Sequence, residues 1–434
     1  ELSILMIKRL FTCTLAWLLL FSAAAKAVTL NVMTSYPQPV VMVMQQAFED
    51  AHPDIELNIL WRRPHDALSL LLQEESADVD VIWMPSVRTF LSLKAHEKLA
   101  QLKINREGLP ILLGETAISD PEGYFIATEV AGYGLFFEPE KLKQAGLVVP
   151  NQWQDLLAAE WQDNIALPIP SEVSFAHMLI DQLLQAEGWQ TGWNQWQQIA
   201  ANSHLMGRGG MFTTEAVLAG QAKVAFTMDF FAATSIANGA NGKFIYPKQT
   251  AFNPAHVGIL AKSTQPEAAH NFVDFLVSEQ GQSLLLHPDL RKLPVRPSVY
   301  SEAPNMQSPF AGYIRHQYDY QTELQRREYN AVVFDAAITL HHDKLKQAWQ
   351  QWHQLQQNAN ADQLAALAEI KTVLQQWPLK EPAMDEAIVQ DCAQRHDDDE
   401  KQQNCEEFKS ELAQSFERQY DKALNMLAQF NAKP

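Results

Sequence analysis

The chain has 434 residues, of which 47% are hydrophobic and 19% are charged, and its formal net charge is −18. This length allows two or three domains of about 150 residues each, and the composition excludes a disordered chain. The negative charge disfavours a nucleic-acid partner, which requires a basic surface. It leaves open an anionic small ligand, because a pocket can be locally positive on an acidic protein.

The first 27 residues have the pattern of a secretory signal peptide. Lys8 and Arg9 precede an apolar run over residues 10–21, and Ala25-Lys26-Ala27 has the A-x-A pattern of a cleavage site. A membrane anchor is the alternative, but the apolar run is shorter than the roughly 20 residues that span a bilayer. We therefore expect a mature chain that begins near Val28 in the periplasm, or otherwise outside the cytoplasm, and that is not embedded in the membrane.

Cysteine usage agrees with an oxidising compartment. Cys13 would leave with the signal peptide, so the mature chain keeps only Cys392 and Cys405. Their spacing, even with the nearby His396, matches no zinc-binding pattern. An even pair in such a compartment favours a disulfide over two free thiols.

The first part of the mature chain alternates short apolar strands with amphipathic helices. Each of the three strands ends in a polar or charged loop, which is typical of an α/β sheet that binds ligands at its carboxyl edge. The expected elements are strands at Val28–Met33, Ile55–Leu60 and Asp78–Trp83 and helices at Val40–Ala51 and Ala67–Glu75.

A long strand is expected in mid-chain, from Tyr124 to Phe137. Gly132 and Gly134 share one face of it, and because they lack Cβ atoms a ligand or another backbone can approach that face closely. With αβ units on both sides, the strand suits a crossing between two lobes with these glycines as the hinge. An ordinary central strand is the alternative.

A second αβ set follows this strand. After it the composition changes: from about Gln307 glycine nearly vanishes and the pattern becomes helical, with Leu345, Ala348, Trp349 and Trp352 on one face. The second set comprises strands at Ile165–Leu167 and Lys223–Met228, helices at Phe175–Ala186 and Thr213–Ala219, a tryptophan cluster at 189–196, and segments at 244–247 and 256–261 that return to the first lobe.

No enzyme motif is present: the sequence has no G-x-S-x-G, no H-E-x-x-H, no phosphate-binding P-loop, and no G-x-G-x-x-G after a strand. Polar residues at strand ends recur instead. Serine hydroxyls and helix amino termini hold anions, arginine binds phosphate or carboxylate with two parallel hydrogen bonds, and aspartate accepts from ligand hydroxyls. The candidates are Ser35, Arg63, Ser86, Ser171, Ser174, Arg208 and Asp229.

Each candidate also has a purely structural interpretation. A serine at a helix start can simply cap the helix, and an arginine can form a surface salt bridge. Asp78 and Asp80 alternate on one strand, so we expect both on an exposed face in water. The acidic run at 397–400 lacks the spaced ligands and glycine of a calcium loop, and His341 and His342 are expected at the surface, so we predict no metal site and no cofactor.

The order of these segments resembles the periplasmic extracellular solute-binding proteins, which have two lobes and two crossing segments. The resemblance rests on VAGYGLFFEPEKLKQAG, IALPIPSEVSFAHML, GQAKVAFTMDFFA and EAAHNFVDFLVSEQGQ. More narrowly, the chain is similar to the phosphoglycerate transport regulatory family, through the Arg63 loop, PSEVSFAHMLIDQLLQAEGWQTGW, Arg208, Asp229, LPVRP and VVFDAAITLHHDKLKQAWQQWH. This similarity extends to about residue 355.

The resemblance implies an α/β, two-lobe periplasmic binding protein fold (class II) with crossing hinge strands and a helical C-terminal extension. Lobe 1 would comprise 28–128 and 257–297, lobe 2 would comprise 129–256, and the extension 298–434. The protein would be no enzyme, and would present its ligand to a membrane sensor kinase or an ABC permease. Iron-binding relatives carry adjacent tyrosines where this chain has Phe230 and Phe231, which cannot ligate ferric ion.

From these observations we expect a small phosphorylated or carboxylated anion as ligand, with phosphoglycerate or phosphoenolpyruvate as the first candidates. Arg63 and Arg208 would hold the anion, the four serines would donate hydrogen bonds, and Asp229 would accept from hydroxyls. A binding protein for ferric ion or a polyamine is the alternative. A hydrolase or a structural adaptor that uses the acidic helical tail is a further one.

Overall fold

The computed structural model describes residues 27–73, 78–207, 210–287, 290–303, 306, 308–311, 317–396 and 398–431. The chain divides into two compact units. Unit 1 comprises the described residues of 1–107, 122–126 and 256–284, and unit 2 those of 108–121, 127–255 and 285–434. The predicted signal peptide, apart from its last residue, and Arg208 lie outside the described residues. The lobe boundaries given above stay a prediction.

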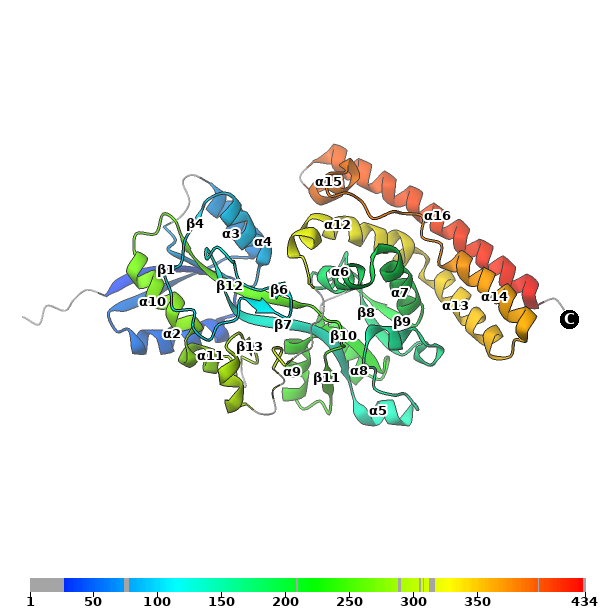
Figure 1. The fold of residues 1–434 in the computed structure, drawn as a ribbon, viewed down its shortest axis with the longest axis horizontal. Coiled ribbons are helices and arrows are strands. Elements are labelled where there is room, and N and C mark those ends of the chain that lie inside the picture. Colours follow the sequence, from blue (N-terminus) through cyan, green and yellow to red (C-terminus); the bar gives the residue numbers. More distant parts are fainter. Residues whose placement is uncertain are drawn as a thin grey trace, which may run out of the picture. The chain divides into compact units, whose positions relative to one another are not determined.

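Unit 1 contains a parallel three-stranded sheet flanked by helices, as the strand–loop–helix pattern predicts (Figure 1). β1 lies between β2 and β3 and runs parallel to both, and β12 adds to β3 in the antiparallel direction. The elements are β1 (Val28–Thr34), α2 (Gln38–Ala51), β2 (Ile55–Trp61), α3 (Pro64–Leu72), β3 (Val81–Met84), α4 (Val87–Ala95), β4 (Leu99–Ala100), α10 (Pro266–Val277) and α11 (Glu279–Leu284), with the end of β12 (Phe252–Leu260).

The prediction that Asp80 lies in water is wrong. Its side chain is 1% exposed. Its carboxylate accepts hydrogen bonds from the Asn31 amide, from the Ser263 hydroxyl and from the amides of Thr264 and Gln265. Because a buried carboxylate is stable only when it is hydrogen-bonded, Asp80 fastens the start of α10 to the sheet of unit 1.

Unit 2 is built around β7, which is buried along almost its whole length. β10 pairs with β7 in the antiparallel direction, and β8 and β9 continue from β10 as parallel strands. The elements before the tail are β5 (Leu112–Leu113), β6 (Thr116–Ala117), β7 (Ile126–Phe137), α5 (Pro139–Gln144), η1 (Trp153–Leu157), η2 (Ala159–Trp161), β8 (Ile165–Pro168), α6 (Ala176–Glu187), α7 (Trp189–Ala201), β9 (Ser203–Met206), α8 (Gly210–Leu218), β10 (Val224–Met228), α9 (Asp229–Ala237), β11 (Lys243–Ile245), β13 (Leu293–Pro294) and η3 (Pro297–Glu302).

The boundary between the units falls inside two strands, as expected for crossing segments. It lies between Ile126 and Ala127 in β7 and between Ala255 and His256 in β12. Gly132 and Gly134 are just beyond it and are packed tightly. A Cβ atom at Gly132 would lie 2.5 Å from the rings of Tyr246 and Phe252, and one at Gly134 would lie 2.2 Å from the Ile245 carbonyl oxygen. Close packing therefore accounts for both glycines, and the hinge stays a prediction.

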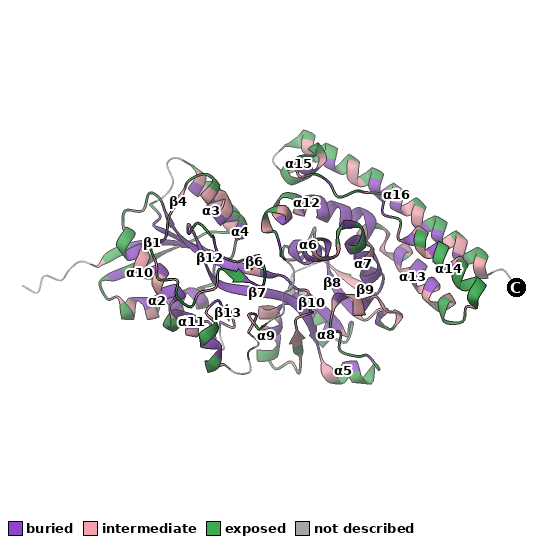
Figure 2. Cartoon of the chain, viewed as in Figure 1, coloured by how far each residue is buried: buried purple, intermediate pink, exposed green. Residues whose placement is uncertain are grey.

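The C-terminal tail is helical, as predicted, and belongs to unit 2. Its helices are α12 (Tyr320–Ala337), η4 (Thr339–His341), α13 (His342–Gln357), α14 (Ala361–Leu374), α15 (Ala387–Gln394) and α16 (Asp399–Asn431). Figure 2 shows α12 mostly buried between α6 and α16, whereas α16 keeps an exposed outer face. The predicted face of Leu345, Ala348, Trp349 and Trp352 is buried.

The predicted disulfide is present and joins the last two helices. Cys392 of α15 and Cys405 of α16 are bonded, and both are fully buried. The surface prediction for His342 is wrong, since the ring is half-buried and its Nε2 lies 2.8 Å from the Ala200 carbonyl oxygen. Within the described part of the chain, no helix combines the length and apolarity needed to cross a bilayer.

Candidate functional site: two polar strand-end clusters

Three of the predicted binding residues follow the three parallel strands of unit 1. Ser35, Arg63 and Ser86 come one or two residues after β1, β2 and β3. The register pairs Thr34 with Trp61 on one side and with Trp83 on the other, so the strands end level with one another. The structure therefore brings these three residues to one sheet edge, which we call the unit 1 edge.

Each member of the unit 1 edge precedes a helix. Ser86 is the N-cap of α4, where its hydroxyl accepts from the Thr89 amide. Arg63 precedes Pro64, the first residue of α3, and Ser35 lies just before α2. Three helix amino termini thus lie at this edge, and each brings the positive end of its dipole there. The capping interpretation of Ser86 is confirmed, and its hydroxyl also lies 2.8 Å from the Thr89 hydroxyl, where either oxygen can be the donor.

Arg63 is the most exposed member of the unit 1 edge. Its side chain is 74% exposed, and its Nε lies 2.9 Å from the Asp66 carboxylate on the next turn. A surface pair of this kind contributes little to stability. The guanidinium group therefore keeps donors that can turn to an anion, at the small cost of leaving Asp66.

Three further candidates follow the strands of unit 2. Ser171 and Ser174 lie in the loop between β8 and α6, residues 169–175, and Asp229 begins α9 directly after β10. Because β8 and β10 are parallel, their carboxyl ends share one side of the sheet. We call these three residues the unit 2 edge. Arg208, predicted to join them, lies outside the described residues.

Ser171 and Ser174 are both held by the C-terminal tail. The Ser171 hydroxyl donates to Oδ1 of Asp335 on α12 at 3.0 Å. The Ser174 carbonyl oxygen accepts from the Arg327 guanidinium, also on α12, at 3.4 Å. A serine has a single hydroxyl proton, so Ser171 cannot donate to an anion while it donates to Asp335.

The Asp229 carboxylate accepts hydrogen bonds from three donors within unit 2. Its Oδ2 accepts from the Gly132 amide at 2.6 Å and from the Tyr246 hydroxyl at 2.9 Å, and its Oδ1 accepts from the Phe230 amide. Burial raises the pKa of Asp229 to about 6, although these hydrogen bonds favour the carboxylate. Oδ1 retains a lone pair for one more donor, such as a ligand hydroxyl.

An open cavity of about 780 Å³ lies beside Asp229 within unit 2. Lys243, Arg291 and Glu302 line it together with Tyr246 and several apolar side chains. Two cations beside the carboxylates of Asp229 and Glu302 suit a ligand that carries both an anionic group and hydroxyls. Neither cation follows a strand end, so the strand-end pattern in the sequence gave no signal for them.

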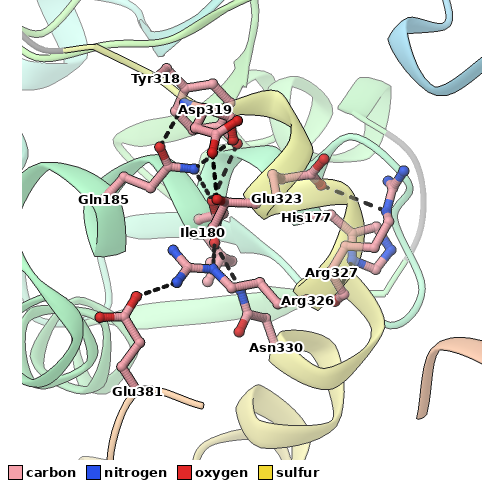
Figure 3. A network of polar contacts seen from close by, with 12 residues as sticks. His177, Ile180, Gln185, Tyr318, Asp319, Glu323, Arg326, Arg327, Asn330 and Glu381 are labelled. Carbon is pink, nitrogen blue, oxygen red and sulfur yellow. Dashed lines mark hydrogen bonds and ion pairs between the residues drawn. The ribbon is translucent and has the colours of Figure 1, made fainter. Parts of the chain in front are cut away.

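The main polar feature that the sequence did not predict is a buried network between α6 and α12 (Figure 3). Asp181 is 0% exposed and Arg326 is 1% exposed, and Arg326 Nε donates to Asp181 at 2.6 Å. Asn330 donates to the same carboxylate, and Arg326 also pairs with Glu381. This network fastens α12 to the helix that follows the Ser171 loop.

Two side chains in this network have strongly shifted pKa values. Burial lowers the pKa of His177 to about 3, so the ring is neutral and its Nδ1 lies 3.2 Å from the Arg327 carbonyl oxygen. Burial, with help from Asp181 and Glu328, raises the pKa of Glu323 to about 7. Among the described residues, no three His, Cys, Asp or Glu side chains are grouped so that they could hold a metal ion.

Comparison with known proteins identifies a matching family. Residues 78–312 match the model of the bacterial extracellular solute-binding protein family. The chain belongs to this family. Family members bind a small-molecule solute for a membrane transport system, and both family and fold are those of transport binding proteins rather than enzymes. The helices from α12 onward lie beyond the matched residues.

A curated relative extends the comparison. The phosphoglycerate transport regulatory protein PgtC of Salmonella typhimurium is 26% identical over 318 residues, which cover 73% of this chain and 78% of the relative. The PgtC protein of Salmonella typhi matches equally well.

Solved structures of family-like proteins share the fold at low identity. Iron-bound HitA from Pseudomonas aeruginosa is 19% identical, with a TM-score of 0.51 over 65% of this chain and 88% of that one. AfuA from Actinobacillus pleuropneumoniae, with fructose-6-phosphate bound, is 16% identical, with a TM-score of 0.51 over 68% and 89%. The ferric binding protein of Campylobacter jejuni is 15% identical, with a TM-score of 0.53 over 74% and 99%. The predicted two-lobe periplasmic binding protein fold is confirmed.

Proposed function

We propose that this solute-binding protein captures a small phosphorylated or carboxylated anion in the periplasm and presents it to a membrane sensor kinase or an ABC permease. Phosphoglycerate and phosphoenolpyruvate are the first candidates. The observation that carries the proposal is the similarity to a phosphoglycerate transport regulatory protein over 73% of the chain. The unit 1 edge supports it, because Arg63, Ser35 and Ser86 are donors at three helix amino termini.

In this proposal residues of both edges bind the solute. Arg63, with Arg208, binds the charged group of the solute, since a guanidinium group matches the geometry of phosphate and carboxylate. Ser35, Ser86, Ser171 and Ser174 donate hydrogen bonds, and Asp229 accepts from the solute hydroxyls. Binding is coupled to closure of the two units around Gly132 and Gly134, and the closed population is the form that the membrane partner recognises.

Ferric ion is the second candidate, because HitA and the Campylobacter jejuni protein are iron-binding relatives in fold. The residues of this chain oppose it. Phe230 and Phe231 offer no oxygen ligand, and burial raises the pKa of Tyr133 well above its ordinary value, which favours a neutral phenol over the anionic ligand that ferric ion requires. A polyamine is opposed by the arginine of the unit 1 edge.

Isothermal titration calorimetry of the mature protein tests the proposal. We expect 2- or 3-phosphoglycerate or phosphoenolpyruvate to bind in the micromolar range or tighter. Arg63→Ala should weaken that binding by about tenfold or more, as expected for loss of a hydrogen bond from a charged group. Arg418→Ala, which removes the same charge from the exposed face of α16, should leave it unchanged.

Two results would overturn the proposal. One is absence of heat with all three anions while ferric citrate or spermidine binds. The other is equal affinity of wild type and the Arg63 and Arg208 variants, which would remove the assigned role of both arginines. Native mass spectrometry of protein purified from its own periplasm identifies the solute independently.

A further inference from the structure

The C-terminal tail contacts the Ser171 loop at several points. On α12, Asp335 accepts from the Ser171 hydroxyl and Arg327 donates to the Ser174 carbonyl oxygen. Lys409 of α16 lies 3.5 Å from the other oxygen of Asp335. Ser171 and Asp335 are 164 residues apart in the chain, and the tail lies beyond the residues that match the family model. The family region and the tail therefore meet at a candidate binding loop.

The tail side of these contacts is rigid. Asp335 is buried, and α12 is fixed to α6 by the Asp181–Arg326 pair and by Asn330. A further ion pair joins Glu328 of α12 to Arg395 at the end of α15. The loop side is more exposed, since both Ser171 and Ser174 face solvent. Of the two partners, the serine is therefore the one that can change its hydrogen bond.

We propose that the C-terminal helices set the solute affinity by holding Ser171: Asp335 binds the only hydroxyl proton of Ser171, and the solute must displace Asp335 to receive it. The inference rests on the proposed role of Ser171 in solute binding. Asp335 acts here as a positioning residue, and Lys409 keeps its carboxylate in place. Because coupling between two equilibria is reciprocal, solute binding also releases Asp335 and Lys409, which carries the bound state into the tail.

The test is a double-mutant cycle read by calorimetry with 3-phosphoglycerate. Asp335→Ala frees the Ser171 hydroxyl and should tighten binding about fivefold, the size of one ordinary hydrogen bond. In the Ser171→Ala background the same change should have no effect, because no hydroxyl remains to be freed. Asp335→Asn keeps an accepting oxygen and should fall between wild type and the alanine variant. Asp343→Ala, an exposed carboxylate on α13, is the charge-matched control.

Unchanged or weaker binding by Asp335→Ala overturns the inference. So does an equal shift in the Ser171→Ala background, which would show that Asp335 acts by another route.

Hydrogen exchange on the full mature chain separates this inference from the proposed function. The Glu172 and Val173 amides bond to the Ile169 carbonyl oxygen inside the loop. Without solute, Asp335→Ala should speed their exchange about fivefold relative to wild type and to Asp343→Ala. If wild type binds none of the anions but exchange responds in this way, only the proposed function fails. If exchange does not respond, tail control of the loop is wrong whatever the solute.

Discussion

The two candidate edges are built in different ways although both lie at the carboxyl ends of parallel strands. At the unit 1 edge each residue is positioned by its own strand–loop–helix junction. The Ser86 hydroxyl, for example, accepts a hydrogen bond from the amide of Thr89, three residues later in the chain. At the unit 2 edge the Ser171 loop is held by α12, a helix about 150 residues further along the chain. Local junctions alone position the residues of the unit 1 edge, whereas distant contacts make the Ser171 loop of the unit 2 edge dependent on the tail.

The largest effect is expected where α12 of the tail is fixed to α6. Arg326→Met leaves the Asp181 carboxylate buried without its cation, and loss of one partner of a buried ion pair costs about 3–5 kcal/mol of unfolding free energy. Urea unfolding measures it, with Arg418→Ala as an exposed control. The Asp181→Leu, Arg326→Met double variant should recover part of the loss. A single-variant loss below about 1 kcal/mol would mean that this pair does not hold the tail.

The disulfide should have the next largest effect. Replacing Cys392 and Cys405 by alanine removes a crosslink that closes 13 residues, which is worth about 3 kcal/mol in the chain-entropy account. The unfolding free energy of the double variant should fall by that amount, and exchange should rise first in α15 and the start of α16. If the double variant raised the amide exchange rates of α15 and of unit 1 by the same factor, the crosslink would not act locally.

Glu323 should make the stability of unit 2 pH-dependent. Its pKa rises from 4.5 in the unfolded chain to about 7, so the protonated form favours folding. That stabilisation is complete below about pH 4.5 and is lost as the pH rises through 7. Glu323→Gln should reduce the drop in unfolding free energy between pH 5 and pH 8 by about 1–3 kcal/mol.

Glu411→Gln, an exposed site on α16, is the matched control and should follow wild type at every pH. If the unfolding free energy of Glu323→Gln changed with pH in parallel with that of wild type, Glu323 would be ionised beside Arg327 throughout this range. The pKa of Asp229 is also raised, to about 6. Both wild type and Glu323→Gln should therefore keep a smaller pH dependence of the unfolding free energy, at lower pH.

The smallest effect is expected at the unit 1 edge. Ser86→Ala removes the side-chain cap of α4 and should cost about 1 kcal/mol of unfolding free energy. Ser171→Ala should cost a similar amount, through the lost bond to Asp335. The two substitutions differ in their dependence on Asp335. In an Asp335→Ala background the loss of unfolding free energy caused by Ser171→Ala should become smaller, and that caused by Ser86→Ala should not. Independent effects at both sites would remove the distinction between the two edges.

These differences explain how much the sequence could predict. Strand alternation and helix periodicity are local, so the strands of unit 1, the helix face at Trp349 and Trp352, and the placement of Ser35 and Ser86 were predicted. The partners of Asp80 are not local: Ser263 lies 183 residues later, so alternation suggested an exposed face where the carboxylate is buried. Asp335 and Arg327 were not found for the same reason, because nothing near them in sequence identifies the loop they contact.

The most direct test of the account is calorimetry of the mature protein with 3-phosphoglycerate, comparing wild type, Arg63→Ala and Arg418→Ala. The account predicts saturable binding by wild type, the same binding by Arg418→Ala, and a loss of about tenfold or more for Arg63→Ala, with no change in unfolding free energy beyond about 0.5 kcal/mol. Equal affinities for all three proteins would contradict it, and so would binding by none of them while ferric citrate binds.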